Sequence, residues 1–312
     1  MLFAGNASVV LIFLINAAFR GAGDAVVAMR VLWLANGINL VLDPCLIFGL
    51  GPFPELGVTG AATATVTGRG IAVLVQIWIL FKLSDRIRVA LHHLVVDLAV
   101  MAGLVRLSSA GTLQTFIATA SWVGLVRILS GFGSEALAGY TIGVRIILFA
   151  LLPSWGMANA AATLVGQSLG AGKPERAEKA VWMAGRLNFY FLGAVGIFFI
   201  VFAGPVVALF GPDPGTAAFA VTFLRIVCSG FFFYAYGMVL TQSFNGAGDT
   251  WTPTWINLGI FWAFEIPLAY AIAIPGGMGP AGVFLAITLA YSALAVVSAV
   301  LFRRGKWKEK RV

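Results

Sequence analysis

The sequence predicts an all-α membrane protein with about nine transmembrane helices, and three observations lead to this prediction. Of the 312 residues, 60% are hydrophobic and only 10% are charged, whereas a soluble domain carries about 25% charged residues. The mean hydropathy of +0.97 leaves too little polar surface for a water-soluble fold of this size. Uncharged runs of about 20 residues, the length that crosses a bilayer, recur along the chain.

Nine apolar runs are long enough to cross the membrane as helices. In chain order they cover residues 2–19, 25–50, 58–82, 109–130, 136–166, 178–210, 216–244, 251–275 and 279–302. Gly- and Pro-rich turns separate several of these runs, because Gly and Pro residues end helices. These turns lie at 51–54, 131–134, 211–215 and 275–277.

Lys and Arg residues occupy alternate loops, and this pattern predicts the orientation of the chain. The loops 50–57, 131–135, 211–215 and 275–280 contain no Lys or Arg, whereas the other loops and the C-terminal tail 303–312 contain many. Because basic loops stay on the cytoplasmic side, we expect a cytoplasmic C-terminus and a chain that starts outside. The same distribution explains the net charge of +8 as a topology signal, so no nucleic-acid partner is expected.

The stretch 83–108 is the most charged part of the chain before the tail, and it predicts an amphipathic cytoplasmic linker. It contains His92, His93 and Asp97, residue types that bind metals. Adjacent histidines point to different faces of a helix, and no third ligand has the spacing of a metal site. We therefore expect no metal there.

An internal repeat links the two halves of the chain. The sequence Phe-Arg-Gly-Ala-Gly-Asp at 19–24 returns as Phe-Asn-Gly-Ala-Gly-Asp at 244–249, each time between two apolar runs. Asp24 and Asp249 are placed to cap the helix that follows. The glycines permit the tight turn before each aspartate; they are Gly21, Gly23, Gly246 and Gly248.

The positions of the two copies predict the domain organisation. The second copy follows four apolar runs of its half and the first follows one, so we expect three spans to be missing ahead of the first residue. The chain then divides into a partial N-terminal lobe (1–82), the linker (83–108), a complete six-helix C-terminal lobe (109–302) and a basic tail (303–312). Parallel repeats of this kind are related by a pseudo-two-fold axis along the membrane normal.

Two further segments, together with the repeated turns, resemble the multidrug and toxic compound extrusion (MATE) family over nearly the whole chain. They are Gly-Tyr-Thr-Ile-Gly-Val-Arg at 139–145 and the loop 166–178, which contains Gly-Ala-Gly-Lys-Pro. The resemblance implies a bacterial or archaeal inner-membrane protein, of which this chain holds helices four to twelve. It also implies export of cationic and amphipathic small molecules in exchange for H⁺ or Na⁺, without another cofactor, and we expect a monomer.

The chain departs from the family pattern at two places. It lacks the first three helices, where many bacterial members carry a functional acidic residue in the first helix. It also has no acidic residue at 109–130, the seventh helix, where the sodium-coupled branch has one. The coupling ion therefore stays open between H⁺ and Na⁺.

Asp43 is the first candidate for ion coupling, because it lies within a span. An ionised Asp at the centre of a membrane helix costs about 2.5–3.5 kcal/mol on insertion scales, so it must face protein or water. Asn36, Asn39 and Asp43 are three and four residues apart and share one helix face, beside a predicted bend at Pro44. Either this stripe binds H⁺ or Na⁺, as the resembling Asn-x-x-x-Asp pair of the family does, or Asp43 is a packed structural acid.

Threonines at the start of the next span are candidates for the same site. Thr63, Thr65 and Thr67 lie at alternate positions in the run 58–82. Thr63 and Thr65 are assigned to the predicted ion site with Asp43. The alternative is that each threonine bonds a carbonyl of its own helix, as is common in membrane helices.

Glu265 is the second embedded acid, near the middle of an apolar run and two residues before Pro267. It is either a second coupling or substrate-attracting carboxylate, or one half of an ion pair with an arginine inside the membrane. Arg69 lies deep in its span and needs a partner or a substrate there. We predict a substrate cavity lined by Glu265, Arg69, Tyr234 and Tyr236, although the tyrosines could instead face lipid.

The predicted function is a secondary multidrug antiporter. The alternative is a flippase for lipid-linked oligosaccharides from the same wider superfamily, which would need a strongly cationic central cavity. An enzyme is not expected, because no nucleophile and base or metal cluster lies at a membrane surface. The sequence contains no GxxxxGK[ST] motif, so ATP is not expected to drive transport from this chain.

Overall fold

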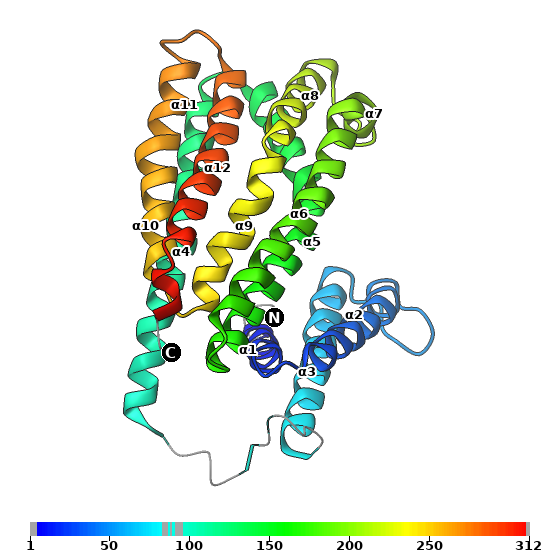
Figure 1. The fold of residues 1–312 in the computed structure, drawn as a ribbon. Helices are drawn as coiled ribbons and strands as arrows, with labels where there is room; N and C mark the ends of the chain where they lie inside the picture. Colours follow the sequence, from blue (N-terminus) through cyan, green and yellow to red (C-terminus); the bar gives the residue numbers. More distant parts are fainter. Residues whose placement is uncertain (1–4, 83–86, 88, 91–95, 310–312) are drawn as a thin grey trace. The chain divides into compact units, whose positions relative to one another are not determined.

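A computed structural model describes residues 5–82, 87, 89–90 and 96–309, and all regular structure in this part is helical (Figure 1). The chain divides into two compact units, Met1–Asp97 and Leu98–Val312. The predicted histidine pair, His92 and His93, and the ends of the tail and of the first span lie outside the described residues.

The described residues of the N-terminal unit form three helices, α1 (Asn6–Gly21), α2 (Ala25–Phe48) and α3 (Val58–Lys82), at the positions of the first three predicted spans. Small residues on α3 allow close packing against α2. An added side-chain carbon at Gly60 would overlap the carbonyl group of Leu46. Small residues spaced four apart are a common way for membrane helices to approach closely.

The C-terminal unit contains the remaining helices. They are α4 (Leu98–Ser130), α5 (Ser134–Gly170), α6 (Pro174–Val201), α7 (Ala203–Ala208), α8 (Pro214–Ser229), α9 (Phe231–Gly246), α10 (Trp251–Asn257), the π-helix η2 (Leu258–Glu265), α11 (Ile266–Ala273), α12 (Pro280–Arg303) and the short 3-10 helix η3 (Lys306–Glu309). The helices α10, η2 and α11 together form one span, Trp251–Ala273.

Among the described residues, seven helices are long and apolar enough to cross a membrane. The pair α8 and α9, bent by 61°, adds one broken span, and α1 is a shorter apolar helix. These nine segments correspond to the nine predicted spans. Two boundaries differ: α4 begins at Leu98, inside the expected linker, and the run 178–210 is interrupted after Val201 by a turn before α7.

The bend between α8 and α9 lies at Gly230, which the sequence analysis placed within one continuous span. An added side-chain carbon at Gly230 would collide with Thr288 of α12. The Thr288 hydroxyl lies 3.1 Å from the Ile226 carbonyl oxygen. In the membrane a broken helix needs such a donor for its freed carbonyl groups.

The repeated Gly-Ala-Gly-Asp turns have the same hydrogen bonds. The N–H of Asp24 donates to the Phe19 carbonyl at 2.8 Å, and the N–H of Asp249 donates to the Phe244 carbonyl at 3.0 Å. The glycine before each aspartate has a positive φ, 85° at Gly23 and 77° at Gly248, which only glycine adopts easily. Both turns are Schellman motifs, which close the C-terminus of a helix.

The two aspartates of these turns differ, and Asp24 is the one that acts as the predicted helix cap. Asp24 caps α2 by accepting from the N–H of Val27 at 3.4 Å. Asp249 is not the capping residue of α10, which is Thr250; it instead accepts from the Thr252 hydroxyl at 2.7 Å. The turn 170–173, Gly-Ala-Gly-Lys, repeats the same bonds between α5 and α6 and is a third copy of this turn, which was not predicted.

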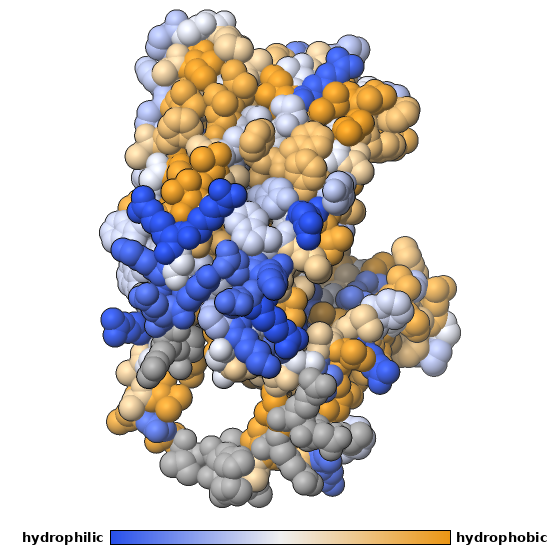
Figure 2. All heavy atoms as spheres, in the orientation of Figure 1, coloured by the Kyte–Doolittle hydropathy of each residue, from blue (hydrophilic) through white to orange (hydrophobic). Residues whose placement is uncertain are grey.

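The surface of the long helices is apolar. Large side chains such as Trp33 of α2 and Phe149 of α5 are 76% and 73% exposed. Figure 2 shows hydrophilic residues gathered at the end of the C-terminal unit that carries the C-terminal segment, while apolar residues cover much of the rest of this face. Apolar surface on this scale needs lipid to cover it, and the chain is a multi-pass membrane protein.

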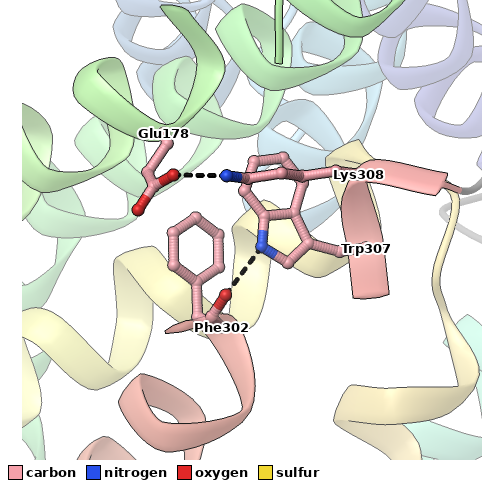
Figure 3. Close-up of polar contacts among 4 residues, drawn as sticks. All are labelled: Glu178, Phe302, Trp307 and Lys308. Carbon is pink, nitrogen blue, oxygen red and sulfur yellow. Dashed lines mark hydrogen bonds and ion pairs between the residues drawn. The ribbon is translucent and has the colours of Figure 1, made fainter. Parts of the chain in front are cut away.

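The segment after α12 is tied to the C-terminal unit (Figure 3). The Trp307 ring is 1% exposed and stacks on Phe302 with 4.6 Å between ring centroids, and its indole N–H donates to the Phe302 carbonyl at 2.9 Å. Lys308 forms an ion pair with Glu178 of α6. Both charged groups are partly exposed, so the buried indole contributes more to this contact than the ion pair.

Gly143→Ala is expected to destabilise the protein, whereas Gly156→Ala on the same helix is not. An added methyl at Gly143 would overlap the Phe223 ring, which is 1% exposed, while nothing lies within 4 Å of one at Gly156. Overpacking costs about 1–3 kcal/mol, more than the roughly 1 kcal/mol that a helix gains from Gly to Ala. Thermal unfolding in detergent checks this, and equal stability of the two variants would contradict the close packing of α5 on α8.

Candidate functional site

The N-terminal unit joins Asn39 and Asp43 of α2 to Thr65 of α3. The Asn39 side-chain amide donates to Asp43 Oδ1 at 3.1 Å and to Thr65 Oγ1 at 3.3 Å. The Thr65 hydroxyl donates in turn to the Ala61 carbonyl at 2.9 Å. This chain of bonds fixes the orientation of Asn39, so that its amide faces the carboxylate.

The helices approach closely at this cluster because of Gly68. A side-chain carbon there would lie 3.0 Å from the Ala35 carbonyl oxygen and 3.4 Å from the Asn39 nitrogen. α2 also continues through Pro44 to Phe48 as one helix. Because proline has no N–H, the carbonyl of Leu40 loses its helix partner beside the acid.

The cluster can hold one proton or a small cation. Both amide hydrogens of Asn39 are used, one on Asp43 and one on Thr65. Asp43 is half-buried, and within the described part of the chain its second carboxylate oxygen, Oδ2, accepts no hydrogen bond. Carboxylate, hydroxyl and carbonyl oxygens are ligands for hard cations, and the carboxylate alone accepts a proton.

Asn36 and Thr63 are the other residues predicted for this site, and their part in it stays a prediction. Asn36 is exposed on α2. The Thr63 hydroxyl donates to the Thr59 carbonyl of its own helix at 2.8 Å, which is the alternative considered for the threonines. Thr63 and Thr65 are two positions apart, a rotation of about 200° around the helix, so only one of them can face α2.

Arg69 lies one turn beyond Thr65 and belongs to the N-terminal unit. With Thr65 and Val66 of α3, and with residues at the start of α1, it lines a cavity of about 350 Å³. No ion pair involving Arg69 is formed within the described residues. Arg69 and Glu265, which were predicted to line one substrate cavity, belong to different units of the chain, and their shared cavity stays a prediction.

The C-terminal unit contains a cavity of about 200 Å³ with Glu265 in its wall. The described residues of its lining are mainly aromatic and aliphatic, and none of them is Lys, Arg or His. The aromatic residues come from α4, α5, α8, α9, η2 and α12; they are Trp122, Tyr140, Trp155, Phe223, Phe231, Tyr234, Phe261 and Tyr291. A single carboxylate in a largely apolar cavity is the arrangement of a small-molecule site.

Glu265 is 3% exposed and its carboxylate contacts one polar side chain of α4. Ser121 Oγ lies 3.0 Å from Glu265 Oε2 and 3.2 Å from the Phe261 carbonyl oxygen. No Lys, Arg or His among the described residues pairs with Glu265, so the arginine pair considered from the sequence is not formed there. The acid lies at the end of the π-helix η2, a rare geometry that is frequent at functional sites.

A second chamber of about 390 Å³ adjoins the first and shares Ala118, Trp155, Tyr234, Phe261 and Tyr291 with it. Amide side chains line its other end. Gln242 Nε2 donates to Asn159 Oδ1 at 2.9 Å, and Asn245 Nδ2 donates to Gln242 Oε1 at 3.0 Å.

The amide series continues to the second Gly-Ala-Gly-Asp turn. Gln114 Nε2 donates to Asn245 Oδ1 at 3.2 Å and to the Thr250 carbonyl at 2.8 Å. Sequence reasoning missed these amides. Their signal was present, because each is a polar residue within or next to an apolar run.

Tyr234 lines both chambers, but Tyr236 does not. The Tyr236 ring packs against Trp182 and Phe189 of α6, with ring centroids 6.2 and 5.9 Å away. Two positions along a helix rotate a side chain by about 200°. The assignment of both tyrosines to one cavity with Glu265 is therefore corrected for Tyr236.

Comparison with known proteins identifies the family. The MatE family profile matches residues 112–271. A probable multidrug resistance protein NorM of Thermotoga maritima is 26% identical over 312 residues, which cover 100% of this chain and 67% of that protein. A probable multidrug resistance protein YoeA of Bacillus subtilis is 24% identical over 315 residues, which cover 100% of this chain and 68% of that protein. An FAD transporter of Shewanella oneidensis is 28% identical over 212 residues, which cover 68% of this chain and 47% of that protein.

Solved structures have the same fold. The outward-facing conformation of a multidrug resistance MATE family transporter of the MOP superfamily superposes with a TM-score of 0.89 at 25% identity, covering 99% of this chain and 69% of that one. MATE in complex with MaL6 gives the same TM-score, identity and coverage. The chain thus spans about two thirds of the length of these relatives. It belongs to the MATE family of membrane transporters and is not an enzyme.

Proposed function

We propose that the chain acts in a secondary multidrug efflux antiporter, which exports cationic or amphipathic compounds in exchange for H⁺ or Na⁺. The family and the names of the NorM relatives support multidrug efflux. In this proposal residues 1–82 are half of the N-terminal lobe and 109–302 are the C-terminal lobe. The protein works as a monomer in the inner membrane of a bacterium or archaeon, with the C-terminus in the cytoplasm.

The observation that carries this proposal is the cluster of Asn39, Asp43 and Thr65 within two packed spans. An ionised carboxylate at the centre of a membrane helix costs about 2.5–3.5 kcal/mol on insertion scales. Binding of H⁺ or Na⁺ removes that cost. If one conformation of the protein binds the ion more tightly than the other, the ion gradient shifts the equilibrium between them by that difference in affinity.

The cavity of the C-terminal unit supports a cationic or amphipathic substrate. Its aromatic walls can hold an apolar cation through ring faces, and Glu265 supplies the opposite charge. A lipid-linked oligosaccharide carries phosphate groups and would need basic residues in this lining, which has none. The chemistry of this cavity therefore favours drug export over the flippase alternative.

Dissipation of the ion gradient tests the proposal. The protein reconstituted into liposomes is expected to move a fluorescent organic cation when a proton or sodium gradient is imposed, and to stop when an ionophore collapses that gradient. The embedded acid and the lack of a nucleotide motif are the reasons. Transport that needs ATP and ignores the gradient would contradict the proposal.

A further inference from the structure

Four amide side chains form a relay of hydrogen bonds that starts at the end of the second Gly-Ala-Gly-Asp turn. Gln114 Nε2 of α4 donates to the Thr250 carbonyl at 2.8 Å and to Asn245 Oδ1 at 3.2 Å. Asn245 Nδ2 donates to Gln242 Oε1 at 3.0 Å, and Gln242 Nε2 donates to Asn159 Oδ1 of α5 at 2.9 Å. The amide relay therefore ends at the wall of the second chamber, which Asn159 and Gln242 line.

The backbone carbonyl of Thr250 fixes the direction of every amide in this relay. An amide group donates at its nitrogen and accepts at its oxygen, and its hydrogen bonds decide which way it points. Because a carbonyl only accepts, Gln114 must turn its nitrogen to Thr250 and its oxygen to Asn245 Nδ2, 3.3 Å away. Each following amide receives an N–H on its oxygen. Reversal of any one amide would bring two oxygens or two N–H groups together.

Asn159 is the open end of the amide relay. Its oxygen accepts from Gln242, so its nitrogen is the atom left for another partner. Among the described residues, no acceptor receives a hydrogen bond from Asn159 Nδ2. An N–H group in this position gains a hydrogen bond from a ligand that brings its own acceptor.

A second amide lines the same chamber. Asn257 of α10 is 9% exposed, and within the described part of the C-terminal unit its side chain has no hydrogen-bond partner. A buried amide without a partner is costly, and a ligand that bonds to it removes that cost. The chamber shares four aromatic residues and Ala118 with the cavity around Glu265. An aromatic ligand held among these rings therefore extends into the chamber that the amides line.

The amide relay also accounts for the one difference between the two copies of the repeated turn. Asn245 stands in the second copy where the first copy has Arg20. Asn245 donates to Gln242 and accepts from Gln114. Arginine has donors only, so it could not pass the direction of the amides on.

We propose that Asn159 and Asn257 form a hydrogen-bonding subsite, which selects substrates that carry an acceptor, such as a carbonyl oxygen, beside their aromatic part. The amide relay holds Asn159 as a donor, so Gln242, Asn245 and Gln114 are positioning residues. The organic cation as ligand rests on the proposed function. The subsite adds a requirement that charge and aromatic surface do not supply.

Two matched derivatives of tetraphenylphosphonium test the subsite. One carries an acetyl group on one ring, and the other carries an isopropenyl group, which has the same shape and no acceptor. Calorimetry gives the affinity of the purified protein for each ion without any ion gradient. The parent is expected to bind the acetyl ion more tightly. Asn159→Leu should lower the ratio of the two affinities about three- to tenfold, the factor that one hydrogen bond contributes.

Gln242→Glu tests the amide relay at about pH 9, well above the ordinary pKa of a carboxyl. An ionised glutamate only accepts, so Asn159 must turn its nitrogen to it and its oxygen to the chamber. The preference for the acetyl ion should be lost, and an amino-substituted ion should now bind more tightly than its methyl analogue. Gln167→Glu is the matched control, because Gln167 of α5 is exposed and lines neither chamber. It should keep the preference of the parent.

The outcomes separate the subsite from the proposed function. No gradient or transport is involved, so a protein that exports nothing still reports the ratio of affinities. The same ratio in the parent and in Asn159→Leu would overturn the proposal, and so would a Gln242→Glu protein that keeps the acetyl preference. Asn159 is exposed, so its replacement leaves the core intact and keeps the test decisive if Gln242→Glu does not fold.

Discussion

Asp43→Asn is expected to abolish gradient-driven export and to leave the amount of protein in the membrane unchanged. Asparagine keeps the size of the side chain and can still accept from the Asn39 amide, which lies 3.1 Å from Asp43 Oδ1. It cannot take up a proton, and it binds Na⁺ weakly without the charge. The two conformations of the protein then no longer differ in their affinity for the ion, so the ion gradient cannot shift the equilibrium between them. Export of a fluorescent cation from cells or liposomes measures the loss.

Two variants complete this test. Asn39→Ala should weaken export less, because the amide orients the acid and carries no charge. Asp213→Asn serves as a matched control, because it also replaces an aspartate by asparagine, but in a loop. The N–H of Thr216 donates to the Asp213 carboxylate at 2.9 Å, and this hydrogen bond lowers the pKa of the carboxyl. Full export by Asp213→Asn is expected. If Asp43→Asn also exports the cation as well as the parent does, Asp43 is only a packing residue.

The positions of the spans could be predicted from the sequence because hydrophobicity alone decides which segments enter a bilayer. The interruptions within these spans could not be predicted from the sequence. The bend at Gly230 depends on its contact with Thr288, more than fifty positions away, and the π-helix η2 lies inside a run with no sequence signal for it. The third turn, at 170–173, repeats the Gly-Ala-Gly pattern and could have been found from sequence.

The two candidate sites differ in how far sequence could define them. Asn39 and Asp43 are four residues apart on one helix, and helix periodicity places them together. The choice of Thr65 over Thr63 depends on which face of α3 meets α2, and that is a property of the packed helices. Ser121 was not predicted at all, because its partner lies 144 positions away and serine is common in membrane helices.

Ala118→Trp is expected to prevent binding of an organic cation to the C-terminal unit. Ala118 lines both chambers of the cavity, so a tryptophan side chain there takes up space in them. Thr119→Trp is the matched control, because Thr119 is exposed, is the next residue of α4 and lines neither chamber. We expect affinity for tetraphenylphosphonium to fall at least about tenfold, or roughly 1.4 kcal/mol, in the first variant alone.

The result also decides which unit holds the substrate. Both variants should unfold at the temperature of the parent, because the added ring enters empty space in one and faces outward in the other. If Ala118→Trp binds the cation as tightly as Thr119→Trp does, the aromatic cavity is not the substrate site. The cavity of the N-terminal unit would then be the next candidate, and the described residues of its lining include Arg69 and no acid. A cation is repelled there, so such a result would point to an anionic or neutral substrate.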